Sequence, residues 1–298
     1  NVNFYAGDLI VNGNVTIYNA DAWVKFTKMS VDHADGVLNI TGDTKYESSI
    51  HNGSTTGTSL VFYNAGKVNI AKETTIEIDN ATTLVEGAEL NIASSNVIAK
   101  GAVTDNGAIN LTDLEAIFTA QEGLTVYNGV EGNTDYGVTY VNGAYKFAQY
   151  VAQIGDKKYL TLQEAINAVE NGNTITLIGT DEFAENILAG NENLKPLNKV
   201  FTIDGDNHVV TGNWRFGRDD HNTDLSEITI KNVNFKGNGI SILDFYKVTI
   251  SECTFNDITT GNAIYVSADE YTSSIVVENC EMNNIEGAGI NFRNPVNA

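Results

Sequence analysis

The chain has 298 residues, of which 42% are hydrophobic, enough for two ordinary cores or one long repetitive core, and this composition excludes intrinsic disorder. Its 17 basic and 38 acidic residues give a net charge of −21, so most of its surface would repel the phosphates of nucleic acid. No stretch approaches the roughly 20 apolar residues that a membrane span requires, so none is expected in this segment.

Short strands joined by tight turns are the expected secondary structure. The sequence is rich in Val, Ile, Thr, Tyr and Asn and holds 27 glycines but only two prolines. The two cysteines are too few for a disulfide framework. We therefore predict an all-β chain.

The first half repeats a phrase in which two aliphatic residues flank an asparagine. It occurs after the glycines Gly36, Gly66, Gly87 and Gly107, at Leu38–Ile40, Val68–Ile70, Leu90–Ile92 and Ile109–Leu111. The spacings of 30, 22 and 19 residues are typical of solenoid coils, and the alternation turns the aliphatic residues inward and the asparagine outward. The earlier segment Asp8–Tyr18 is interpreted as a hairpin or as a coil of the same kind.

Aromatic strands end the first half. Asn142-Gly143 predicts a hairpin that closes a first unit spanning residues 1–148. Tyr136, Tyr140 and Tyr145 are candidate binding residues, because tyrosine is frequent in interfaces and stacks on sugar rings. The alternative is that they pack in the core of the hairpin.

One helix is expected, near residues 161–171. Thr161 and Glu164 form a capping box, Leu162 and Ile166 lie on an apolar stripe, and Gly172 is placed to end the helix. A second unit spanning residues 149–298 begins with it.

Two kinds of strand phrase recur in the second unit, which predicts a parallel β-helix whose coils stack on one another. The first kind is Ile228–Phe235, Val248–Phe255 and Ile275–Met282, and the second is Gly237–Ile242, Gly261–Val266 and Gly287–Phe292. The first kind buries its first, third, sixth and eighth residues. Cys253 and Cys280 share one such column, so we predict two reduced, buried thiols on adjacent coils.

Three segments carry a resemblance to a known family: Tyr159–Val169, Gly172–Leu177 and Phe201–Gly212. Together they resemble the opening of the pectin-lyase-like right-handed parallel β-helix repeats found in large cell-surface proteins of gut bacteria. The resemblance covers about half of the chain. It implies a β-solenoid in which the helix caps the first coil of the second unit, and a secreted protein at the bacterial cell surface.

The family includes pectate lyases and polygalacturonases, so the acidic clusters were tested against their patterns. The weak catalytic candidates are Arg218, Asp219, Asp220 and Asp224. Their motifs stand in the reverse of the polygalacturonase order and abut on one segment, whereas an inverting hydrolase needs carboxyl groups roughly 6.5 to 9.5 Å apart. No catalytic set is assigned, and a solvated or ligand-contacting loop is the preferred interpretation.

Aromatic and basic residues next to these acids are candidates for binding instead. Trp214, Arg215, Phe216 and Arg218 are interpreted as an exposed loop that could contact a partner. The segment Asp204–Asn207 lacks the further ligands of an EF-hand, so Ca²⁺ is a weak candidate and no cofactor or metal is expected.

The leading hypothesis is a noncatalytic adhesion segment of a bacterial surface protein, with a host glycoprotein or glycan as partner and an immunoglobulin as one candidate. A polysaccharide lyase or glycoside hydrolase is the alternative, and a purely structural stalk is the third reading. Because Gly287–Phe292 still matches the repeat, the natural protein is expected to continue with further coils or a cap after Ala298.

Overall fold

The structure is a computed structural model of the chain. It describes residues 4–5, 8–18, 22–26, 28–42, 44–48, 61–78, 80–189, 198–217, 224–243, 245–267 and 274–293. The chain forms two compact units, Asn1–Ala148 and Gln149–Ala298. Within the described residues, no helix is long and apolar enough to cross a lipid bilayer.

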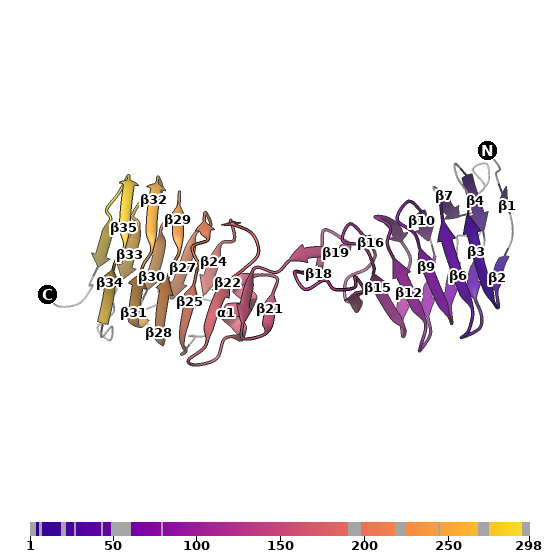
Figure 1. The fold of residues 1–298 in the computed structure, drawn as a ribbon, viewed down its shortest axis with the longest axis horizontal. Coiled ribbons are helices and arrows are strands. Elements are labelled where there is room, and N and C mark those ends of the chain that lie inside the picture. Colours follow the sequence, from indigo (N-terminus) through magenta and orange to yellow (C-terminus); the bar gives the residue numbers. More distant parts are fainter. Residues whose placement is uncertain are drawn as a thin grey trace. The chain divides into compact units, whose positions relative to one another are not determined.

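The first unit is a three-sided parallel β-solenoid, because every third strand joins the same sheet (Figure 1). Sheet A contains β1 (Phe4–Tyr5), β4 (Ala22–Phe26), β7 (Thr44–Ser48), β10 (Thr75–Ile78), β13 (Asn96–Ala99) and β16 (Ile117–Thr119). Sheet B contains β2 (Asp8–Val11), β5 (Lys28–Val31), β8 (Val61–Asn64), β11 (Thr82–Leu84) and β14 (Val103–Asp105). Sheet C contains β3 (Asn14–Tyr18), β6 (Val37–Thr41), β9 (Lys67–Ile70), β12 (Glu89–Ile92), β15 (Ala108–Leu111) and β17 (Val126–Asn128).

The repeated aliphatic-asparagine phrase forms the middle of sheet C. Leu38 pairs with Val68, Val68 with Leu90, and Leu90 with Ile109, and all four side chains are buried. The prediction of stacked coils with inward aliphatic residues is therefore confirmed. The segment Asp8–Tyr18 is a coil and not a hairpin, since β2 pairs with β5 and β3 pairs with β6.

An antiparallel hairpin covers one end of sheet A. Strands β18 (Tyr136–Val141) and β19 (Ala144–Gln149) are joined by Asn142 and Gly143, whose φ angles of 52° and 82° suit a tight type I′ turn. Strand β19 pairs antiparallel with β16, the last parallel strand of that sheet. The hairpin that Asn142-Gly143 predicts is confirmed.

Close approach of successive coils explains a turn glycine of the first unit. The carbonyl of Gly36 accepts the backbone N–H of Lys67 at 2.9 Å, which brings Gly66 directly against the preceding coil. A Cβ atom at Gly66 would collide with the Gly36 carbonyl and would lie 2.6 Å from the His33 carbonyl oxygen. Only glycine fits at this corner without moving backbone.

We predict that Gly66→Ala lowers the free energy of unfolding of the first unit by about 1–3 kcal/mol, since the added methyl group overpacks the corner. Thermal melting followed by circular dichroism should show an earlier first-unit transition and an unchanged second-unit transition. Gly13→Ala is the matched control, because a Cβ atom there meets nothing within 4 Å. Equal effects of the two substitutions would contradict the packing argument.

The second unit is also three-sided, with sheets in which every third strand recurs. Sheet D contains β20 (Ala152–Ile154), β21 (Lys157–Tyr159), β22 (Thr174–Leu177), β25 (Val200–Asp204), β28 (Asp224–Lys231), β31 (Phe245–Ser251) and β34 (Ser274–Glu278). Sheet E contains β23 (Glu182–Phe183), β26 (Val209–Val210), β29 (Asn234–Lys236), β32 (Thr254–Ile258) and β35 (Glu281–Ile285). Sheet F contains β24 (Ile187–Ala189), β27 (Trp214–Gly217), β30 (Ile240–Leu243), β33 (Ile264–Ser267) and β36 (Ile290–Arg293).

Helix α1 (Leu162–Ala168) contacts the first strands of the second unit and buries Leu162, Ala165 and Ile166 in the core. The Thr161 hydroxyl accepts the backbone N–H of Glu164 at 3.1 Å, as the capping box predicts. The Glu185 carboxylate accepts the N–H of Leu162 at 2.7 Å, where the helix dipole is positive. The helix is shorter than the 161–171 segment expected, because the backbone is already extended at Val169.

The eight-residue phrase of the second unit is two strands and not one. Strands β28 and β29 are separated by a corner at Asn232, and the equivalent residues Glu252 and Asn279 share its left-handed conformation, with φ between 53° and 55°. The corner explains why the buried residues of the phrase skip from the third position to the sixth. Each complete coil of the second unit therefore has three strands, whereas the sequence showed two kinds of strand phrase.

Only one of the two cysteines is fully buried. Cys253 has 0% exposure, and burial raises the pKa of its thiol to about 12. Cys280 is partly exposed, since its coil, formed by β34, β35 and β36, is the last one described and nothing described packs on its far side. Both cysteines are free in the structure, and the prediction that Cys280 is buried is wrong.

We predict that a thiol reagent labels Cys280 in the native protein, whereas Cys253 reacts only after unfolding, because it is inaccessible and remains protonated. Mass spectrometry of the labelled peptides separates the two sites. The variant Cys280→Ser should show only the slow reaction. Fast native labelling of Cys253 would mean that its coil opens readily.

Candidate functional site

The outer face of sheet C carries a row of four asparagines, one on each of four neighbouring strands: Asn39, Asn69, Asn91 and Asn110. Each lies between two buried aliphatic residues, so the alternation of a strand turns it outward. The register brings all four side chains into line. We call this row the asparagine wall.

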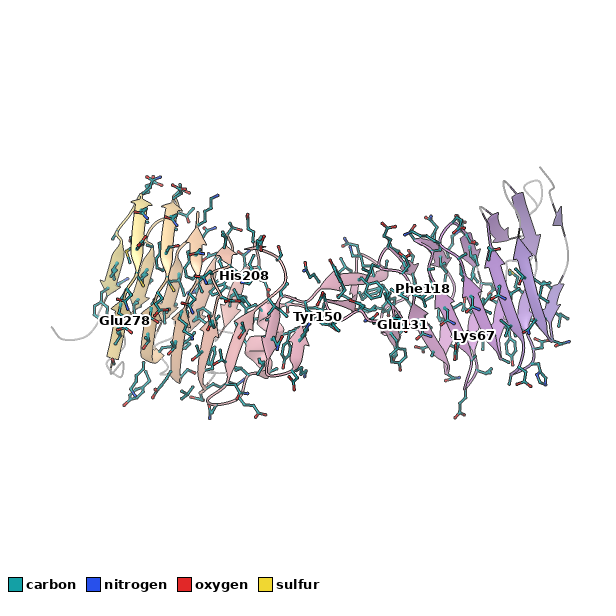
Figure 2. All side chains as sticks on the ribbon, in the orientation of Figure 1. Lys67, Phe118, Glu131, Tyr150, His208 and Glu278 are labelled. Atoms are coloured by element: carbon teal, nitrogen blue, oxygen red, sulfur yellow. The ribbon has the colours of Figure 1, made fainter. Side chains whose placement is uncertain are left out.

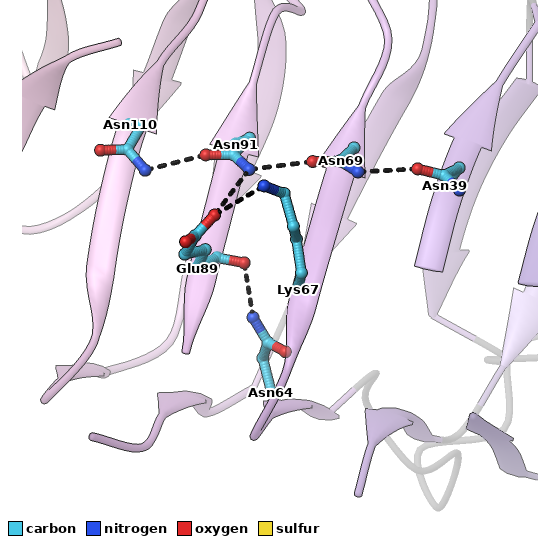
Figure 3. Close-up of polar contacts among 7 residues, drawn as sticks. All are labelled: Asn39, Asn64, Lys67, Asn69, Glu89, Asn91 and Asn110. Atoms are coloured by element: carbon cyan, nitrogen blue, oxygen red, sulfur yellow. Dashed lines mark hydrogen bonds and ion pairs between the residues drawn. The ribbon is translucent and has the colours of Figure 1, made fainter. Parts of the chain in front are cut away.

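The amides of the asparagine wall are joined by hydrogen bonds (Figure 3). The Nδ2 of Asn110 donates to the Oδ1 of Asn91 at 2.8 Å, Asn91 donates to Asn69 at 2.9 Å, and Asn69 donates to Asn39 at 2.7 Å. Asn39 donates in turn to the hydroxyl of Thr16, at 3.4 Å. The side chains are held in one orientation along the wall.

An ion pair borders the asparagine wall on one side. Lys67, labelled on the ribbon in Figure 2, places its Nζ 2.8 Å from Glu89 Oε2, and the amide of Asn91 also reaches that carboxylate at 3.5 Å (Figure 3). Hydrogen bonds from Lys67 and Asn91 hold the pKa of the Glu89 carboxyl below its usual range. The Glu89 carboxyl is therefore charged at neutral pH, and the ion pair contributes little net charge.

Small residues border the wall on the other side and leave a groove of about 490 Å³. Ala71 and Ala93 form part of its floor, while Thr41 and Thr112 also line it. Tyr127 follows Asn110 in register on β17, and its side chain is 50% exposed. The surface thus combines fixed amides, hydroxyls, methyl groups and one accessible aromatic ring.

A buried asparagine supports the corner that leads into this surface. Asn64 is fully buried, and its Nδ2 donates to the backbone carbonyl of Glu89 at 2.9 Å (Figure 3). Its Oδ1 accepts the N–H of Gly66 at 3.0 Å. Asn64 therefore satisfies two backbone groups from two coils, and it fixes where β9 and β12 begin.

We predict that Asn69→Ala lowers the free energy of unfolding of the first unit by about 1–2 kcal/mol, and Asn110→Ala by about half as much. A central asparagine loses two wall hydrogen bonds and the terminal one loses a single bond, each of which contributes about 0.5–1.5 kcal/mol. Urea unfolding of both variants tests the ratio. Equal effects would show that the bonds do not act independently.

The second unit has a different outer face, on sheet D. Thr202, Thr229 and Thr249 form a column in register on β25, β28 and β31. Ion pairs flank the column on both sides, with Lys247 3.1 Å from Glu227 and Lys231 2.9 Å from Asp204. The groove along it has a volume of about 120 Å³, much smaller than the groove of the asparagine wall.

Two of the three candidate tyrosines of the hairpin, Tyr140 and Tyr145, hold the end of the first unit together. Tyr145 is 5% exposed, lies 6.3 Å from Phe118 between ring centroids, and its hydroxyl donates to the Gln121 carbonyl at 3.1 Å. Tyr140 packs against Tyr145 and donates to the Ala120 carbonyl at 3.2 Å. Tyr136 is partly exposed on β18. Packing in the hairpin core, the alternative reading, describes Tyr140 and Tyr145.

The expectation that Trp214 and Phe216 lie on an exposed loop is wrong. Both have 0% exposure on β27, where Trp214 pairs with Ile240 and packs edge-on against Phe235 at 5.3 Å. Their side chains belong to the core and reach no partner at the surface. Arg215, between them, is partly exposed and faces outward.

The candidate catalytic residues Arg218, Asp219 and Asp220 lie outside the described residues. Asp224 is the first residue of β28, and its backbone pairs with Phe245. Among the described residues, no three His, Cys, Asp or Glu side chains are grouped so that they could hold a metal ion.

The sequence contains signals both for the asparagine wall and for the burial of Trp214 and Phe216. The repeated phrase already places the asparagines outward and in one line, but their mutual hydrogen bonds and the neighbouring groove depend on the register and on the small size of Ala71 and Ala93. Trp214 and Phe216 are two residues apart, as are the buried residues of the phrases in β30 and β33.

Comparisons with protein-family models, with curated proteins and with solved structures find no match for the chain.

Proposed function

We propose that this chain is a noncatalytic binding segment of a secreted bacterial surface protein, and that it presents a solenoid wall to a glycan or glycoprotein of the host. The observation that carries the proposal is the asparagine wall with its adjoining groove. A rigid, polar and hollowed surface formed by several coils is suited to holding an extended ligand. The resemblance of the second unit to repeats of surface proteins supports the location.

The chemistry of the groove favours binding over catalysis. Its lining consists of amides, hydroxyls, methyl groups and aliphatic chain, together with Lys67. Amides and hydroxyls recognise a ligand by hydrogen bonds but do not ionise near neutral pH, so they are poor general acids or bases. Lys67 and Glu89 form an ion pair, and the lowered pKa of the Glu89 carboxyl makes it a weaker base.

The test is a binding screen of the full chain against neutral glycans, acidic polysaccharides, mucin and immunoglobulin, by biolayer interferometry. We predict saturable binding to at least one of them, without release of reducing ends or unsaturated uronides during prolonged incubation. Product release would establish the alternative, a polysaccharide lyase or glycoside hydrolase. If none of these probes binds, the result would favour the structural stalk.

A further inference from the structure

We propose that the asparagine wall is the binding site and that its ligand is an uncharged glycan chain, which lies against the wall across β6, β9, β12 and β15 and in the groove beside it. This inference rests on the proposed function and assigns it a place and a ligand class. Four arguments support it: the unused hydrogen-bonding capacity of the amides, the apolar floor, the rigidity of the row and the local charge.

The amides of the wall retain capacity that matches sugar hydroxyls. An asparagine side chain has two N–H donors and two acceptor positions on its oxygen, and the hydrogen bonds along the wall use one donor and one acceptor at Asn69. One donor and one acceptor therefore remain on the same side chain. A sugar hydroxyl both donates and accepts, so it can satisfy the two groups together.

The floor of the groove complements the apolar side of a sugar. Ala71 and Ala93 offer methyl groups for contact with C–H groups, and Tyr127 continues the row with an exposed ring on which a sugar can stack. The volume of about 490 Å³ lies within the range of ordinary ligand sites. Four strands cover about 14 Å at the usual spacing of neighbouring strands, so the wall fits an oligosaccharide and not a single sugar.

The row is ordered before any ligand arrives. Each central amide is held on both sides, by Asn91 and Asn39 in the case of Asn69. Binding then restricts few side-chain rotations, which reduces the entropic penalty of association. Asparagines on a flexible loop would instead lose the free rotation of their side chains on binding.

The charge around the groove favours a neutral ligand. Lys67 is neutralised by Glu89 at 2.8 Å, and Lys72, farther along, is shared by Asp113 at 3.3 Å and Glu115 at 2.6 Å. With a net charge of −21 on the chain, an anionic polysaccharide would be repelled. The threonine column of the second unit offers a smaller groove between two rows of ions, so it is the weaker candidate.

The test uses the full chain and four neutral polysaccharides, namely β-glucan, mannan, galactan and dextran, with polygalacturonate as the anionic counterpart. We predict that at least one neutral polymer binds and that raising the salt concentration changes its affinity little, as measured by isothermal titration calorimetry. Asn91→Ala and the groove-filling Ala93→Leu should each weaken binding by about tenfold, and Tyr127→Ala should weaken it several-fold. Ser241→Leu and Asn256→Ala, on outer faces of the second unit away from the threonine column, are the controls and should bind as the unchanged protein does.

The possible outcomes separate the two proposals. Binding that survives Asn91→Ala, Ala93→Leu and Tyr127→Ala would overturn the site while leaving the proposed function standing. Preference for polygalacturonate would overturn the assignment of an uncharged ligand. Absence of binding to every polysaccharide would overturn the uncharged-glycan ligand, whereas the proposed function falls only if mucin and immunoglobulin also fail to bind. Tyr127→Ala keeps the test valid if a groove variant fails to fold, because that ring is exposed on the surface.

Discussion

The structure depends on one constraint, which is that each coil must pair its backbone in register with the coils before and after it. Parallel pairing leaves a strand two faces, one of which must be buried, so a shift by a single residue would exchange the core for the surface. The register of Leu38, Val68, Leu90 and Ile109 satisfies this requirement in three successive pairings. The same register that stacks the aliphatic side chains inside also aligns the asparagines outside.

This coupling explains how a repetitive sequence can form a site without any catalytic motif. A single outward asparagine on a strand would be an ordinary solvated side chain. Four in register satisfy one another, lose their rotational freedom and become a continuous polar surface. The property belongs to the stack of coils and to none of the residues separately.

Much of the fold could be predicted from the sequence, because strand alternation, the capping box at Thr161 and the Asn142-Gly143 turn are local signals. Features that depend on neighbouring coils were harder to predict. The corner at Asn232 requires a left-handed residue in the middle of an apparently continuous strand. Trp214 and Phe216 stand beside charged residues, yet the strand that pairs with Ile240 and Ile242 turns them inward. Cys280 matches Cys253 in sequence but lacks a covering coil among the described residues.

The hairpin of β18 and β19 has a consequence for how the first unit can change in length. By turning the chain antiparallel against β16, it removes the template on which another parallel strand of sheet A would grow. A further coil can enter only upstream of the hairpin, and it must enter whole, since a partial coil would break the register of all three sheets. Each such insertion would add one strand to sheet C and one place to its outer row. The length of the asparagine wall can therefore change only in steps of one coil, and the hairpin fixes the end beyond which the wall cannot extend.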